Sequence, residues 1–325
     1  MMYLQVAAGL VILLICGELL VRGSVALAEL FGVSKLVIGF TIVAFGTSAP
    51  ELVVCISAAL EGAPGIAFGN VVGSNIANVL LVLGVPALIY PLTCDNQSAL
   101  RDSFIMIGGS LFFAALAWAG YIGFFEGALL VAFLALVIYL AYRRARVSGE
   151  DSADDALEEY EENMPKSIWL SLIFVLAGLV GLIAGSTLLV DGAVSIATAA
   201  GVSEEIIGLT LVALGTSLPE LATSLIAAFR RHGDVAIGNV LGSNLFNITG
   251  IIGATALIKP LEAPAQILHF DLLIMLAASA ILIPIFLLRK PVGRVLGAVF
   301  CAAYISYIFA QFFGMSGVHS IAMMQ

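Results

Sequence analysis

Two short polar segments interrupt hydrophobic stretches of this chain in nearly the same way. The first reads GTSAPE and ends at Glu51, and the second reads GTSLPE and ends at Glu220. Each proline lacks an amide hydrogen and its ring clashes with the carbonyl four residues earlier, so a helix opens there and frees backbone carbonyls for a ligand. Carboxylates, hydroxyls and carbonyls together form an all-oxygen set, which suits a hard cation such as Ca²⁺ or Na⁺.

The residues around each break are spaced to share one helical face. Positions i, i+3, i+4 and i+7 lie on the same side of a helix, and the helix after each segment adds a serine and an asparagine at i and i+4. The candidate cation ligands are Ala44, Thr47, Ser48, Glu51, Ser74 and Asn78, with Ala213, Thr216, Ser217, Glu220, Ser243 and Asn247 in the second copy. The set contains no thiol or imidazole, so zinc and copper are poor candidates.

The two glutamates carry the functional interpretation. A single serine or asparagine in a membrane helix usually only joins helices, whereas an intramembrane carboxylate is by default a functional group. Glu18 differs from both, because Arg22 lies one turn away and a structural ion pair is expected there.

Other classes of function remain to be weighed. An intramembrane hydrolase using Ser48 or Ser217 would need a nearby general base such as histidine, and neither segment has one. We therefore do not expect an enzyme. A channel is a further alternative, which strict dependence of the flux on a counter-ion would exclude.

The composition requires a membrane around these segments. Of 325 residues, 61 % are hydrophobic and only 11 % are charged, against roughly 25 % charged residues in ordinary soluble domains. We expect an all-α integral membrane protein with ten transmembrane helices. The spans are placed near 3–22, 33–60, 66–91, 101–119, 122–142, 167–190, 202–229, 235–258, 267–288 and 293–313.

The distribution of basic residues assigns the two sides of the membrane. With ten spans, twelve of the thirteen lysines and arginines fall on one side and only Lys259 falls on the other. Because basic residues favour the cytosolic side, we expect a multi-pass cell-membrane protein with both termini outside. The 143–166 link, which holds eight acidic residues between Glu150 and Glu162, is expected in the cytosol as a solvated linker.

The chain also repeats itself. GTSAPE and GTSLPE are 169 residues apart, and the same offset relates GNVVGSN at 69–75 to GNVLGSN at 238–244. We therefore divide the chain into a first half (1–142), the linker (143–166) and a second half (167–325). Five helices is an odd number, so the halves would enter the membrane from opposite sides, as in the inverted repeats of many secondary transporters.

These paired motifs, GTSAPE with GNVVGSNIAN and GTSLPE with GNVLGSNLFN, resemble the two α-repeats of the cation/Ca²⁺ exchanger superfamily. The chain looks most like a prokaryotic or archaeal sodium/calcium exchanger. The resemblance implies that Glu51 and Glu220 hold Ca²⁺ together with the backbone carbonyls of Thr47 and Thr216. It further implies that the Na⁺ sites are completed by the carbonyls of Ala44 and Ala213 with Ser48, Ser217, Ser74 and Ser243. The central position would be lined by Asn78 and Asn247.

Two departures narrow the expected chemistry. Several relatives, including K⁺-dependent ones, carry aspartate where this chain has Asn247, so we expect K⁺-independent exchange and a site charge of −2. The proton-coupled branch typically has a glutamate soon after its Gly-Asn pair, where this chain has only Val71, Val72, Val240 and Leu241.

We therefore expect an electrogenic antiporter that exchanges Ca²⁺ for Na⁺ by alternating access, with a Ca²⁺/H⁺ exchanger on the same fold as the alternative. The expected partners are the two transported ions and the lipid bilayer. No cofactor, no nucleic acid and no obligate protein partner is expected.

Overall fold

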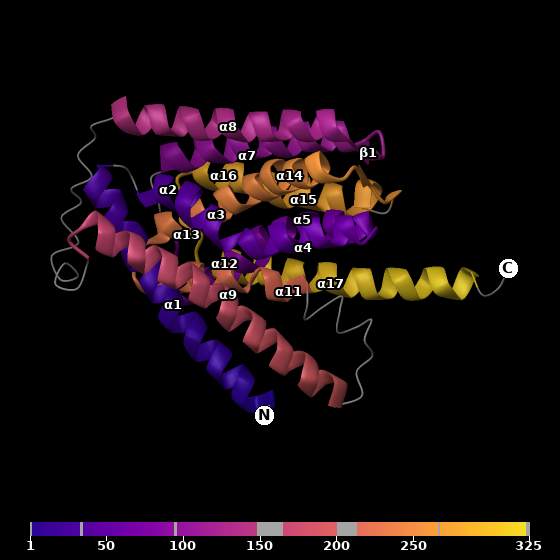
Figure 1. Cartoon of the computed structure of the whole chain (residues 1–325), viewed down its shortest axis with the longest axis horizontal. Helices are drawn as coiled ribbons and strands as arrows, with labels where there is room; N and C mark the ends of the chain where they lie inside the picture. Colours follow the sequence, from indigo (N-terminus) through magenta and orange to yellow (C-terminus); the bar gives the residue numbers. More distant parts are fainter. Residues whose placement is uncertain are drawn as a thin grey trace.

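The fold was analysed in a computed structural model, which describes residues 2–32, 35–93, 96–147, 165–199, 213–265 and 267–322. Within these ranges the chain forms a bundle of helices with several helical breaks (Figure 1). Labels with η mark π-helical turns.

The first half supplies the elements α1 (Met2–Phe31), α2 (Lys35–Ile38), η1 (Gly39–Val43), α3 (Ala44–Thr47), α4 (Ala49–Leu60), α5 (Pro64–Ala77), η2 (Asn78–Val82), α6 (Gly84–Ile89), α7 (Asn96–Ala117), β1 (Tyr121–Ile122) and α8 (Phe124–Val147). The second half supplies α9 (Ile168–Ala199), α11 (Ala213–Thr216), α12 (Leu218–Phe229), α13 (Gly233–Leu245), η5 (Phe246–Ile251), α14 (Ile252–Ile258), β2 (Leu261–Glu262), η6 (Ile267–Asp271), α15 (Leu272–Ala280), α16 (Leu282–Leu287) and α17 (Arg294–Ala322).

Most of the expected spans are present as helices. The described residues contain eight helices long and apolar enough to cross a membrane, and a ninth if the bent pair Gly39–Thr47 and Ala49–Leu60 is one span. The expected span 202–229 is described only from residue 213, and its first part lies outside the described residues. Most of the expected linker, 148–164, also lies outside them. The described start of that linker is helical, because α8 continues to Val147 rather than ending near 142.

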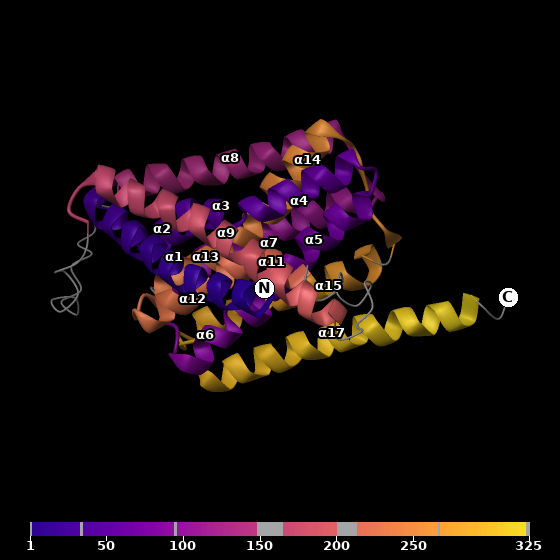
Figure 2. The same cartoon turned by 60° about the horizontal axis from the view of Figure 1, so that its bottom comes forward.

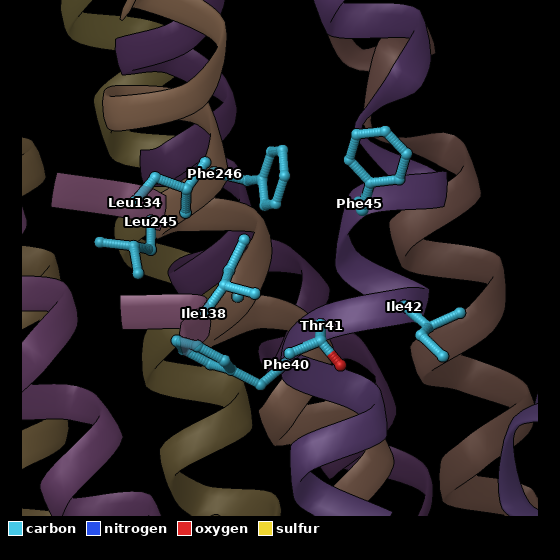
Figure 3. A pocket seen from close by; sticks show the side chains of 9 residues that line it. Phe40, Thr41, Ile42, Phe45, Leu134, Ile138, Leu245 and Phe246 are labelled. Atoms are coloured by element: carbon cyan, nitrogen blue, oxygen red, sulfur yellow. The ribbon is translucent and has the colours of Figure 1, made fainter. Parts of the chain in front are cut away.

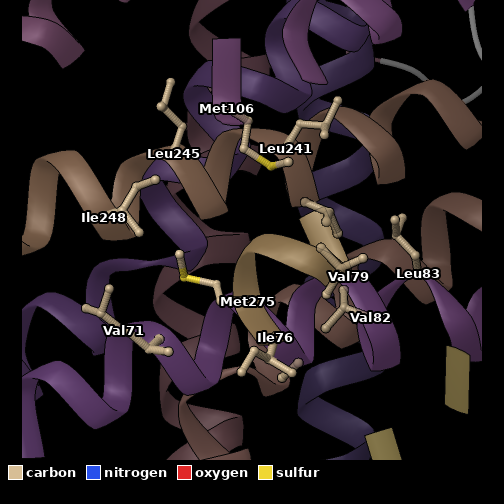
Figure 4. Packing of buried hydrophobic residues seen from close by; sticks show 14 of the residues in the cluster. Val71, Ile76, Val79, Val82, Leu83, Met106, Leu241, Leu245, Ile248 and Met275 are labelled. Atoms are coloured by element: carbon tan, nitrogen blue, oxygen red, sulfur yellow. The ribbon is translucent and has the colours of Figure 1, made fainter. Parts of the chain in front are cut away.

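The helices that carry the repeated motifs occupy the centre of the bundle. In the most apolar part of Gly233–Ile258, 89 % of the residues are buried, against 17 % for Arg294–Gln311 in α17. Side chains from α5, η2, α13, η5, α7 and α15 interlock there (Figure 4). By contrast, α17 follows one edge of the bundle (Figure 2) and exposes large apolar side chains such as Val295 and Phe309, as a lipid-facing helix would.

Helices α1 and α9 form a long pair at the periphery, and one end of the pair extends away from the rest of the bundle (Figure 1). A Cβ at Gly178 would lie 2.7 Å from the backbone nitrogen of Leu20, so this glycine permits the close approach of the pair. Helix α1 continues to Phe31, nine residues beyond the predicted end of the first span at residue 22, so Arg22 lies well within the helix.

The expected ion pair between Glu18 and Arg22 is confirmed, and the structure enlarges it. Arg230, at the C-terminal end of α12, also pairs with the Glu18 carboxylate. This cluster joins the first helix of the chain to a motif helix of the second half. Each of the three side chains thereby has an oppositely charged partner, which lowers the cost of placing charges at a membrane.

Short backbone pairings join the links between helices. The expectation of an all-α chain is therefore not fully met. Strands β1 and β2 pair antiparallel, with Ile122 opposite Leu261, and Leu92 forms a bridge with Val292. The chain leaves its helices at these points, and each freed backbone group needs a partner. The pairings bring the α7–α8 link beside the residues after α14, and the residues after α6 beside the link before α17.

Candidate functional site

Both GTS segments open their helices, as the prolines predict. Ser48 (φ −83°, ψ 6°) and Ser217 (φ −87°, ψ 4°) leave helical geometry, and a new helix starts at the following residue with proline in its first turn. In the first half the axes of Gly39–Thr47 and Ala49–Leu60 differ by 47°. The expected single helical face is therefore divided between two short helices that meet at the serine.

Each glutamate lies in the first turn of the helix that begins after its break, and both side chains are fully buried. A helix N-terminus carries partial positive charge, which favours a carboxylate there. Glu51 and Glu220 are also close enough for their charges to interact. The two breaks thus bring the two carboxylates of distant segments to one place.

Contacts between the halves hold the motif side chains together. Ser48 Oγ donates a hydrogen bond to Glu220 Oε1 at 3.1 Å, and Thr47 Oγ1 lies 3.5 Å from Ser243 Oγ. On the other side, Thr216 and Ser74 are neighbours of the Glu51 carboxyl group. Each glutamate is therefore surrounded by hydroxyl groups that come from both halves.

Many oxygens in this cluster have no hydrogen-bond partner among the described residues. They are both carboxylate oxygens of Glu51 and one of Glu220, the hydroxyls of Ser74 and Ser217, and the side-chain oxygens of Asn78, Asn244 and Asn247. Within the described part of the chain, neither Glu51 nor Glu220 has an ion-pair partner. An unpaired buried charge costs several kcal/mol, so this arrangement fits side chains that are completed by bound cations.

The expected asparagines lie at helical irregularities. Asn78 begins η2 and Asn247 lies within η5, and π-helical turns are frequently found at functional sites. Asn247 Nδ2 donates a hydrogen bond to Asn75 Oδ1 at 3.0 Å. The Oδ1 atom of Asn247, on the other branch of the same amide, has no partner among the described residues. Asn78 is buried and neither its oxygen nor its nitrogen is hydrogen-bonded to a described residue.

Of the twelve expected ligands, direct contacts connect Glu51, Glu220, Thr47, Thr216, Ser48, Ser74 and Ser243, and Thr47 Oγ1 lies 3.4 Å from the carbonyl of Ala44. Asn78, Ser217 and Asn247 are buried without a direct hydrogen bond to another expected ligand in the described chain. Ala213 begins α11, and its side chain lies outside the described part.

Four asparagines of the site were missed by the sequence analysis. Asn75 and Asn244, one turn from the expected ligands, exchange hydrogen bonds with each other's backbone carbonyls at 3.0 and 3.2 Å. Asn70 and Asn239 contact the motif threonines of the opposite half. The signal was available, because Asn70 and Asn239 precede Ser74 and Ser243 by four residues and so continue the same helical face.

Small residues let the motif helices meet closely. A Cβ at Gly242 would lie 2.7 Å from the Ala44 side chain, so any larger residue would separate α13 from α3. Beside this crossing is a cleft of about 300 Å³, lined in part by Phe45 and Phe246 (Figure 3). The centroids of these two rings are 5.0 Å apart. The lining of the cleft is apolar apart from Thr41, whose hydroxyl donates to the Val37 carbonyl, so it offers no cation ligands.

Comparison with known proteins agrees with this geometry. The model of the family "Sodium/calcium exchanger protein" matches residues 1–143 and 170–313, which includes both motif regions. The chain belongs to the sodium/calcium exchanger protein family. The resemblance to the cation/Ca²⁺ exchanger superfamily, inferred from the paired motifs, is thereby confirmed.

Several known proteins match this chain over nearly its whole length. The putative antiporter CaxA of Alkalimonas amylolytica is 37 % identical, and the match covers 94 % of this chain and 97 % of CaxA. The sodium/calcium exchanger MaX1 of Methanosarcina acetivorans is 31 % identical over 96 % and 98 % of the two chains. A solved structure of the sodium-calcium exchanger NCX_Mj, soaked with Na⁺ and Ca²⁺, is 33 % identical, with a TM-score of 0.80 over 95 % and 98 % of the chains.

This exchanger is accordingly a helical, multi-pass membrane protein of a family of cation/Ca²⁺ antiporters. That family consists of transporters and not of enzymes.

Proposed function

We propose that this protein exchanges Ca²⁺ for Na⁺ across the cell membrane by alternating access. The observation that carries the proposal is the group of buried, unpaired oxygens around Glu51 and Glu220, at the crossing of two broken helices. Two carboxylates with neutral oxygens suit one Ca²⁺ or several Na⁺ ions. The relatives MaX1 and NCX_Mj are sodium/calcium exchangers by name, which supports the same pair of ions.

The proposed ligand roles follow the chemistry of each group. Glu51 and Glu220 hold Ca²⁺ with the carbonyls of Thr47 and Thr216, because the divalent ion needs both charges. The Na⁺ ions use weaker, neutral ligands, which are the carbonyls of Ala44 and Ala213 and the hydroxyls of Ser48, Ser217, Ser74 and Ser243. Asn78 and Asn247 complete the central position.

The proposed architecture is ten transmembrane helices in two inverted five-helix repeats, residues 1–142 and 167–325, joined by the linker 143–166. Contacts at equivalent positions support the repeat: Asn75 and Asn244, which exchange hydrogen bonds, are 169 residues apart. Inversion allows one site to be opened from either side by movement of one repeat against the other.

The proposed topology has both termini outside and the linker in the cytosol. It requires the links that follow the expected spans 66–91, 202–229 and 267–288 to share the inner side. The links that follow 33–60, 101–119 and 235–258 must share the outer side. Leu92 does pair with Val292, Arg231 lies over the ring of Tyr90, and the Lys259 amine reaches the carbonyl of Leu60. Each of these contacts joins links assigned to one side.

Na⁺ coupling without K⁺ is proposed from the neutral residues of the site. No third acidic, histidine or cysteine side chain joins Glu51 and Glu220 to form a larger cluster in the described part of the chain. The negative charge of the proposed site therefore comes from these two glutamates. Asn247 adds no third charge. The residues that follow Asn70 and Asn239 are apolar and offer no additional proton acceptor.

Ion-substitution flux in proteoliposomes tests the proposal. The purified protein would be reconstituted, and Ca²⁺ uptake would be driven by an outward Na⁺ gradient, a matched K⁺ gradient or a pH gradient. We expect uptake with Na⁺ only, unaffected by adding K⁺ to both sides. Uptake driven by the pH gradient alone would instead establish the Ca²⁺/H⁺ exchanger, and uptake without any counter-ion would indicate a channel.

The linker gives a second prediction. Deletion of residues 150–162 should leave basal exchange within about twofold of the full chain, because the acidic run lies outside both repeats and lacks the pattern of a calcium-binding EF-hand loop. Initial rates of Na⁺-driven Ca²⁺ uptake, normalised to inserted protein, would measure this. A well-inserted but inactive deletion variant would show that the linker takes part in transport.

A further inference from the structure

The threonine of each GTS segment donates its hydroxyl hydrogen to an asparagine of the other half. Thr47 Oγ1 lies 3.1 Å from Asn239 Oδ1, and Thr216 Oγ1 lies 3.3 Å from Asn70 Oδ1. An amide oxygen can only accept, so in both pairs the hydroxyl is the donor. The two contacts are separated by the same 169-residue offset, so the arrangement occurs twice in one molecule.

A second partner fixes the orientation of each asparagine. The Nδ2 group of Asn239 lies 3.4 Å from Ser224 Oγ, and that of Asn70 lies 3.4 Å from Cys55 Sγ. These contacts point the amide nitrogen at the asparagine's own half and leave the amide oxygen facing the threonine. Asn239 is fully buried, so water cannot replace it as the acceptor.

The hydroxyl of Thr47 has another acceptor within reach. Its Oγ1 atom lies 3.4 Å from the backbone carbonyl of Ala44, three residues earlier, and threonines in helices commonly form such bonds. A hydroxyl has one hydrogen, and the shorter contact to Asn239 takes it. If Asn239 could not accept, the hydrogen would turn to the Ala44 carbonyl or to the Ser243 hydroxyl, which lies 3.5 Å away. Either way it would occupy an oxygen that the proposed function gives to Na⁺.

We infer that Asn239 is a positioning residue that keeps the Thr47 hydrogen off the Na⁺ ligands, and so sets the affinity for Na⁺ relative to Ca²⁺. The inference rests on the proposed function. Na⁺ depends on each neutral oxygen, whereas Ca²⁺ is held mainly by two carboxylates. Loss of the asparagine oxygen therefore weakens Na⁺ binding more than Ca²⁺ binding.

The test uses the full-length protein in proteoliposomes, with Ca²⁺ self-exchange and its inhibition by Na⁺ as separate readouts. In Asn239→Leu, the Na⁺ concentration for half-inhibition should rise about fivefold, the size expected for one misdirected hydrogen bond, while the Ca²⁺ half-saturation changes less than about twofold. As a matched control, Ser110→Ala removes another buried hydroxyl, bonded to the Met106 carbonyl in α7, and should shift neither value.

A double variant separates positioning from packing. Thr47→Val removes the hydrogen, so Asn239→Leu should have no additional effect on Na⁺ inhibition in the Thr47→Val background. Equal changes in Na⁺ and Ca²⁺ values, or additive effects in the double variant, would overturn the inference. If Asn239→Leu does not insert, the smaller Asn239→Ala also removes the acceptor oxygen, and with Thr47→Val it provides the same cycle. Wild-type self-exchange that Na⁺ does not inhibit would instead refute the proposed function.

Discussion

Replacing either buried glutamate by glutamine should nearly abolish Ca²⁺ transport. Glu51→Gln and Glu220→Gln keep the size and hydrogen-bonding ability of the side chain but remove one of the two charges of the site. At an effective dielectric constant of about 20, a single charge pair at 4 Å is worth about 4 kcal/mol. We therefore expect Ca²⁺ uptake and Ca²⁺ affinity to fall by roughly a hundredfold or more, while the protein still folds.

The two variants should behave alike, because each glutamate is fully buried and surrounded by hydroxyls from both halves. Ca²⁺ uptake in proteoliposomes and direct calorimetric titration of Ca²⁺ would measure the loss. Glu126→Gln is the matched control: this carboxylate accepts the Gly123 amide at the start of α8, away from the site, so its variant should transport normally. Near-normal flux in either site variant would remove the assignment of both glutamates.

The membrane potential should strongly change Ca²⁺ transport. The site carries −2 from its glutamates, because Asn78 and Asn247 are neutral. One Ca²⁺ brings it to zero, whereas three Na⁺, the number that the family resemblance implies, bring it to +1. Each cycle then moves one net charge, which is worth about 2.3 kcal/mol per 100 mV. The Ca²⁺ ratio at equilibrium should therefore shift about fiftyfold per 100 mV, with a negative interior favouring Na⁺ entry and Ca²⁺ export.

Vesicles with a fixed Na⁺ gradient and an imposed diffusion potential would test this prediction. Reversing the sign of the potential should reverse the effect on the Ca²⁺ ratio, and protein-free vesicles at the same potential give the background leak. A ratio that ignores the potential would instead support two Na⁺ per Ca²⁺, because two monovalent ions also neutralise a −2 site.

The sequence predicted the local features of the site well. Pro50 and Pro219 cannot continue a helix hydrogen-bond ladder, and both helices do open at the preceding serines. The ion pair of Glu18 with Arg22 was likewise predictable from a spacing of four residues. Helix ends were less predictable: α1 runs to Phe31 because nothing in the sequence after Arg22 stops it, and packing against α9 extends it.

The partners of the site residues were not predictable in the same way. Asn239 contacts Thr47 across 192 positions of the chain, and Asn75 contacts Asn247 across 172. Such pairs depend on the angle and depth at which two helices cross, which small residues such as Gly242 permit but do not specify. The π-helical turns that hold Asn78 and Asn247 also have no simple sequence signal.

The membrane environment, the two helix breaks, the oxygen chemistry and the family could all be predicted from the sequence, because composition, proline geometry and repeated motifs act within a few turns of helix. Which oxygens meet depends instead on how distant helices pack. The described fold brings both carboxylates into one buried cluster and leaves three of their four oxygens without partners. That outcome depends on long-range packing, since a hydrogen bond exists only where two distant helices place donor and acceptor within about 3 Å.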